Sequence, residues 1–71
     1  MDTVTARVTV KVVTGETFLS SWSEESPETW EEVRRFLSGM THLDQFDITT
    51  ADGTKIFINP AHIVYAYVET K

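Results

Sequence analysis

Residues 3–14, TVTARVTVKVVT, alternate between apolar and polar side chains with hardly an exception. One side of this segment carries Val4, Ala6, Val8, Val10 and Val12, and the other carries Thr5, Arg7, Thr9 and Lys11. A period of two in β-branched residues is typical of a strand with one buried face. The sequence therefore predicts a long first strand whose aliphatic side lies in the core.

The segment that follows changes to a helical period. Ser26 is suited to cap a helix, and Pro27 is suited to its first position, where no N–H is needed. We predict a helix over residues 27–38, ended by Gly39 in a left-handed conformation. Its apolar face consists of Trp30, Val33, Phe36, Leu37 and Met40, which recur at intervals of three and four.

The remaining strands are short and are separated by turn signals. They are predicted at residues 17–22, 45–50, 54–59 and 63–69. Asp52 and Gly53 form the pair preferred in a tight type I′ hairpin turn. Asn59 and Pro60 favour a single helical turn before the last strand.

This order of elements predicts a small α+β fold, with one domain over residues 1–71. One helix has to cover one face of a curved, mostly antiparallel sheet, because no other element is available to bury that face. A small, partly open β-barrel is the alternative. The predicted inner face of the sheet consists of Val4, Ala6, Val8, Val10, Val12, Phe18, Phe46, Ile48, Ile56, Ile58, Val64, Ala66 and Val68. Trp22 is expected on the same side of its strand as Phe18.

The sequence offers little for catalysis. It contains no nucleophile elbow, no glycine-rich phosphate loop and no cysteine, so a disulfide framework and a thiolate zinc site are excluded. His42, Asp44 and His62 are the candidate metal ligands, but they lack the spacing of a ligand motif. We therefore expect a protein that is not an enzyme and that uses no cofactor and no metal.

The same sequence indicates a soluble cytoplasmic protein. The first ten residues lack the basic and apolar regions of a signal peptide. No apolar run approaches the roughly 20 residues that a membrane-spanning helix needs. The absence of cysteine fits a reducing compartment.

The whole chain has a net charge of −5, and its negative charge is concentrated in one segment. Six carboxylates and no basic residue lie between positions 16 and 32, namely Glu16, Glu24, Glu25, Glu28, Glu31 and Glu32. One interpretation is a solvated surface that keeps the protein soluble. The other is an acidic patch directed at a basic partner.

A candidate partner-binding face lies opposite the predicted core. It carries three basic and three aromatic residues, Arg7, Lys11, Lys55, Phe57, Tyr65 and Tyr67. The aromatic residues are either cross-strand pairs that stiffen the sheet or part of a contact surface. Exposed aromatic clusters with a polar rim are typical of interfaces, so these six residues are the predicted binding site.

Two functions fit this description. The first is a protein-interaction or assembly module with a regulatory role, which binds a protein partner or copies of itself through a sheet face or an edge strand. We expect a homo-oligomer, with the proline-free first strand as a competing site for strand pairing. The alternative is a single-stranded nucleic-acid binder, which the isoelectric point near 4.7 disfavours.

Overall fold

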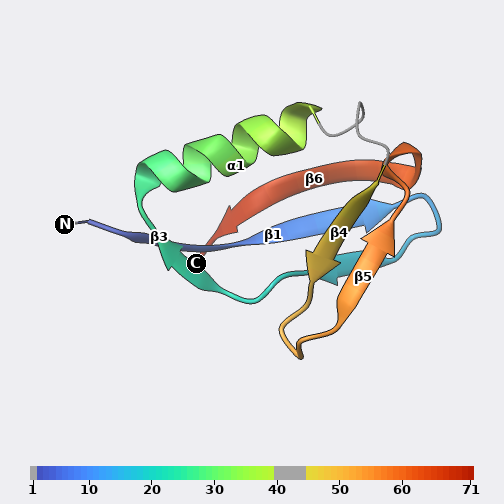
Figure 1. The fold of residues 1–71 in the computed structure, drawn as a ribbon, viewed down its shortest axis with the longest axis horizontal. Coiled ribbons are helices and arrows are strands. Elements are labelled where there is room, and N and C mark those ends of the chain that lie inside the picture. Colours follow the sequence, from blue (N-terminus) through green and yellow to red (C-terminus); the bar gives the residue numbers. More distant parts are fainter. Residues whose placement is uncertain (1, 40–44) are drawn as a thin grey trace.

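The computed structural model describes residues 2–39 and 45–71 (Figure 1). Its strands are β1 (Val4–Val12), β2 (Thr17–Leu19), β3 (Ser23–Glu25), β4 (Phe46–Thr49), β5 (Lys55–Ile58) and β6 (Ile63–Thr70). Its helix is α1 (Pro27–Gly39), and a 3₁₀ turn, Pro60–His62, precedes β6. The predicted α+β fold is confirmed, with β3 as one more short strand before the helix.

Strand β1 is the centre of a four-stranded antiparallel sheet, the main sheet. Strand β6 pairs with it from Ala6 to Val12, whereas β2 and β3 pair with its two ends. Because β6 occupies one edge of β1 over this whole length, β2 and β3 share the other edge. The expectation that the first strand offers a free edge for self-association is therefore wrong.

Strands β4 and β5 form a second, two-stranded antiparallel sheet. An isolated bridge between Ser20 and Thr50 links this hairpin to the main sheet. The described strands thus form two sheets, not the single curved sheet or the barrel that the sequence suggested. The physical reason is that the hairpin has its own apolar side, which it buries by crossing the main sheet next to α1 (Figure 1).

The core lies between the main sheet on one side and α1 with the β4–β5 hairpin on the other. Its buried members are Val10, Val12, Leu37, Phe46, Ile48 and Ile58. Partly buried residues pack around them, namely Val8, Phe18, Val33, Ile56, Ile63, Ala66 and Val68. The alternation in β1 is confirmed as the pattern that faces this core.

A β-bulge changes the inner face of β6. Lys11 lies opposite Tyr65, but Val12 lies opposite Ile63, so Val64 is an extra residue in the ladder. Ile63 packs against the core, whereas Val64 is exposed. The prediction that Val64 faces inward is therefore wrong.

The turns of the β1–β2 and β4–β5 hairpins have the same backbone conformation. Gly15 and Gly53 have φ angles of 94° and 88°, and their N–H groups donate to Val12 and Thr50, respectively, at 2.9 Å. No other residue in the described ranges has a positive φ, so Asp52 does not adopt the conformation that a type I′ turn requires. Both loops are instead type I turns followed by a left-handed glycine.

Helix α1 begins as predicted and ends differently. The Ser26 hydroxyl accepts the Thr29 N–H at 3.2 Å, which confirms the N-cap. Gly39 remains in the helix without a positive φ, so the predicted left-handed end is wrong. Met40 lies outside the described residues. Within those residues, no helix is long and apolar enough to cross a membrane.

The two large aromatic residues of α1 have different environments. Trp30 is 5% exposed, and its Nε1–H donates to the Val4 carbonyl at 2.7 Å. Phe36 is 50% exposed, and its ring lies 6.1 Å from that of Phe46. Phe36 thus lies at the border of the core and does not fill it, contrary to the sequence expectation.

We expect Trp30→Ala to cost about 3–5 kcal/mol of unfolding free energy, because it removes a buried ring and leaves the Val4 carbonyl without its donor. Phe36→Ala should cost about 1–2 kcal/mol, since half of that ring is already in water. Urea denaturation of both variants measures the difference. Equal losses would contradict the described packing of α1.

The carboxyl group of Asp52 should respond to pH. Its pKa is lowered, first by the hydrogen bond from the Thr50 hydroxyl and then by the Thr54 N–H at 3.0 Å. These bonds stabilise the turn above the unfolded-state pKa of about 3.9 and are lost as the pH falls through the lower folded-state pKa. We expect a carbon NMR titration to show the lowered pKa, and Thr50→Val to raise it. A wild-type carboxyl that titrates at the ordinary value would contradict this.

Candidate functional site

One face of the main sheet points away from the core and is called the outer sheet face. It is formed by the side chains that alternate with the buried valines of β1 and by their partners on β6. Its members are Arg7 opposite Glu69, Thr9 opposite Tyr67, and Lys11 opposite Tyr65. These residues form three cross-strand pairs in one continuous row.

Two tyrosines occupy the middle and one end of this row. The rings of Tyr65 and Tyr67 lie 5.8 Å apart with a tilt of 35°, and both residues are 46% exposed. The ammonium group of Lys11 lies 5.9 Å from the Tyr65 ring. Thr9 is buried between Tyr67 and Leu19, which flank it on the two neighbouring strands. The sheet beneath the two tyrosines is therefore closed to solvent, whereas their rings are partly exposed.

A second aromatic group lies at the other end of the row. The guanidinium carbon of Arg7 lies 4.2 Å from the centre of the Trp22 ring, and the ammonium group of Lys71 lies 5.6 Å from it. Arg7 also donates from Nε to Glu69 Oε1 at 2.7 Å. Two cations therefore lie against the indole ring, and one of them, Arg7, is also bound to a carboxylate.

Trp22 is a part of this face that the sequence reasoning missed. The prediction extended the second strand to residue 22 and placed Trp22 beside Phe18. Instead β2 ends at Leu19, and the Ser20 hydroxyl accepts the Val8 N–H at 2.8 Å. The chain then turns, and Trp22 stacks on Arg7, whereas Phe18 packs against the core. The serines at positions 20 and 21 were the available signal that the strand is interrupted.

These charged contacts orient side chains more than they stabilise the fold. Arg7 and Glu69 are both partly exposed, and such ion pairs contribute about 0–1 kcal/mol. A cation over an exposed aromatic ring adds about 0.5–1 kcal/mol. The outer sheet face is thus ordered without being buried.

Two of the six predicted site residues lie elsewhere. Lys55 and Phe57 belong to β5, where Ile56 and Ile58 are the residues that face the core. Phe57 is 68% exposed, and the Lys55 ammonium group lies 5.6 Å from its ring and 4.0 Å from Asp47 Oδ2. Because the two sheets enclose the core between them, the outward sides of β5 and of the main sheet face opposite directions.

The expectation that all six residues share one face is therefore wrong. The structure brings Arg7, Lys11, Tyr65 and Tyr67 together on the outer sheet face and separates Lys55 and Phe57 from them. The cause is the second sheet, which the alternation pattern alone does not reveal.

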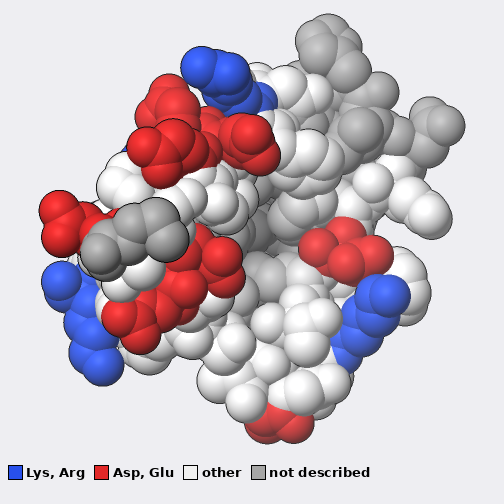
Figure 2. All heavy atoms as spheres, turned by 60° about the vertical axis from the view of Figure 1, so that its left-hand side comes forward, with Lys and Arg blue, Asp and Glu red and all other residues white. Residues whose placement is uncertain are grey.

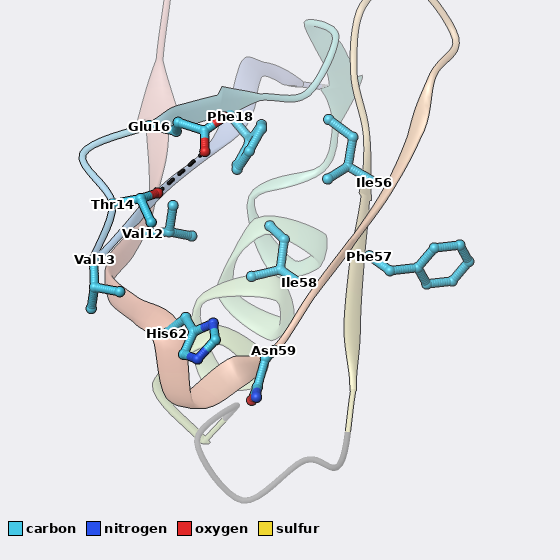
Figure 3. A pocket seen from close by; sticks show the side chains of 10 residues that line it. All are labelled: Val12, Val13, Thr14, Glu16, Phe18, Ile56, Phe57, Ile58, Asn59 and His62. Atoms are coloured by element: carbon cyan, nitrogen blue, oxygen red, sulfur yellow. Dashed lines mark hydrogen bonds between the residues drawn. The ribbon is translucent and has the colours of Figure 1, made fainter.

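A cavity of about 220 Å³ opens between the two layers at the side of β5, and is called the core mouth (Figure 3). Val12 and Phe18 form one wall, and Ile56 and Ile58 form the other. The polar residues that line it are Thr14, Glu16, Asn59 and His62. Its volume is below the roughly 300 Å³ that is usual for small-molecule sites.

Three of the acidic residues, Glu24, Glu25 and Glu28, lie at one end of the molecule, in β3 and at the start of α1. Figure 2 brings this end forward and shows Asp and Glu side chains clustered there, with Lys and Arg at the borders of the cluster. Glu16, which the sequence groups with them, lies instead at the core mouth.

One of the three candidate metal ligands lies in the part of the chain that the structure describes. Over residues 2–39 and 45–71, no three His, Asp or Glu residues are grouped so that they could hold a metal ion. His62 lies in the 3₁₀ turn, and the candidate ligands His42 and Asp44 lie outside the described residues.

No protein-family model, curated protein or solved structure matches the chain.

Proposed function

We propose that this protein is a small non-enzymatic interaction module that binds a protein partner through the outer sheet face. The observation that carries the proposal is the pair of tilted, half-exposed tyrosine rings on β6, a strand whose other face packs against the core. A regulatory role belongs to the same proposal, and so does a cytoplasmic location, which a chain without cysteine fits.

The residue types on this face are those that contribute most to protein interfaces. Tyrosine, tryptophan and arginine are enriched among the residues whose truncation costs the most binding energy. Tyr65, Tyr67 and Trp22 offer ring area that a partner can bury, and the tyrosine hydroxyl groups stay hydrated until it does. The aromatic centre with charged neighbours matches the usual division of an interface into an apolar core and a polar rim.

The face is also ordered in advance. Glu69 and Trp22 hold the Arg7 side chain from two sides, and the two tyrosine rings pack against each other. Side chains that are already fixed lose less conformational entropy on binding. The cations Arg7, Lys11 and Lys71 favour a partner with carboxylates around an apolar centre, because such charges would be complementary.

The proposal predicts that Tyr65→Thr combined with Tyr67→Thr abolishes binding while the fold survives. Threonine is a good strand former, and both rings are already half exposed, so the stability loss should be small. Binding is measured with a photoreactive phenylalanine analogue at Trp22, which captures whatever protein contacts this face in the cell. We expect a discrete crosslinked protein in the otherwise unchanged chain and its loss in the double variant.

The matched control carries the same analogue at Phe36, which is also half exposed but lies on α1. It should not capture the same protein. Thermal melting of the double variant shows whether the fold is intact. The proposal is wrong if the folded double variant captures the same protein from position 22, or if position 36 captures it equally well.

A second candidate function is binding of single-stranded nucleic acid. The observation that favours it is the placement of cations against aromatic rings, Arg7 at Trp22 and Lys11 at Tyr65, since bases stack on such rings while cations hold phosphates. The net charge of −5 opposes it. If it holds, oligonucleotides should quench Trp22 fluorescence at low salt, with an affinity that falls steeply as salt rises. Trp22→Phe identifies the source of the signal, and unchanged fluorescence at low salt would exclude this function.

A further inference from the structure

The core mouth is an opening into the core itself. Its walls are side chains that elsewhere pack against the hydrophobic cluster, with Val12 and Phe18 from the main sheet and Ile56 and Ile58 from β5. In Figure 3 these four side chains point toward one another across the opening. The cavity has room for one large apolar side chain and is too small for a typical small-molecule ligand.

Phe57 is the counterpart of this opening. It is the most exposed large apolar residue in the described part of the chain, and its ring points away from the cavity (Figure 3). No packing within the described chain requires a phenylalanine there, because a polar strand former would suit a position that is 68% exposed. An exposed ring next to an apolar opening is typical of an interaction surface.

Charge is complementary across the same two features. The Lys55 ammonium group lies over the Phe57 ring, 5.6 Å from its centre, and its contact with Asp47 is a long ion pair of 4.0 Å between exposed groups. Glu16 lines the core mouth, where it accepts the Thr14 hydroxyl at 3.2 Å. A second copy that placed its Phe57 in the mouth would bring its Lys55 toward Glu16.

Phe57 and two of the residues that line the core mouth, Ile56 and Ile58, lie on the same short strand, β5. The Phe57 side chain leaves β5 on the opposite side from Ile56 and Ile58, but Phe57 is itself among the residues that line the core mouth, so the exposed ring lies beside the opening. A surface that contains both parts can pair with its own copy about a two-fold axis, and such an interface closes after two subunits. We infer that two copies of this chain form a two-fold dimer in which Phe57 of each copy occupies the core mouth of the other.

This dimer goes beyond the proposed function, because it uses a different surface. The outward side of β5 faces away from the outer sheet face, so the tyrosine rows of both copies stay free. The result for the dimer is therefore independent of whether the outer sheet face binds a protein. The residue that fills the core mouth in this dimer is Phe57 of the second copy.

Sedimentation equilibrium over a wide range of protein concentration tests the dimer. Wild-type protein should show a monomer–dimer equilibrium without larger species. Phe57→Ser should raise the dimer dissociation constant at least about ten-fold, the effect expected for an aromatic residue at the centre of an interface. Phe36→Ser, which removes a half-exposed ring from α1, is the matched control and should leave the dissociation constant unchanged.

A charge exchange tests the geometry of the contact. Lys55→Glu and Glu16→Lys should each weaken the dimer, because each places like charges opposite one another in both halves of the interface. The two changes combined should restore it toward the wild-type dissociation constant. Both residues are exposed, so these variants keep the fold, which circular dichroism verifies.

Three results would overturn the inference. One is a wild-type protein that stays monomeric at millimolar concentration. Another is a Phe57→Ser variant that dimerises like wild type, which would place the dimer interface elsewhere. The third is a combined Lys55→Glu and Glu16→Lys variant that dimerises no better than either single variant.

Discussion

The pairing of β1 on both of its edges is the constraint on which the rest of the structure depends. One strand holds β6 along one edge and divides the other between β2 and β3. The inward valines of β1 pack in the core, and its outward residues lie in the middle of the outer sheet face. The same nine residues therefore decide what is buried and what a partner can reach.

Local patterns in the sequence are sufficient for most elements of the fold. The alternation in β1, the Ser26 cap and the Asn59 cap, whose Oδ1 accepts the Ala61 N–H at 3.0 Å, all depend on residues that are close in the chain. The errors concern tertiary contacts. Val64 faces outward because the ladder with β1 contains a bulge, and Phe36 stays half exposed because the β4–β5 hairpin shares the core with α1. Neither the bulge nor the sharing of the core can be predicted from the spacing of apolar residues in the sequence.

The same distinction explains the outcome for the candidate site. Arg7, Lys11, Tyr65 and Tyr67 were correctly grouped, because alternation places them opposite the core on two strands that prove to be neighbours. The pattern in β5 is equally regular, but it does not say to which sheet the strand belongs. Assigning Phe57 to the right surface requires knowing that β5 pairs with β4 alone.

The ladder between β1 and β6 also has a consequence for how the chain folds. It joins Arg7 to Glu69 and Thr9 to Tyr67, so its partners are separated by almost the full length of the chain. Helix α1 and the two hairpins involve near neighbours and can form early, whereas this ladder has to wait for a large loop to close. On a ribosome, β1 is made before the other described strands, and its edge that pairs with β6 stays unpaired until β6 has emerged. The strand that organises the finished sheet is thus the one that is longest exposed to wrong partners during synthesis.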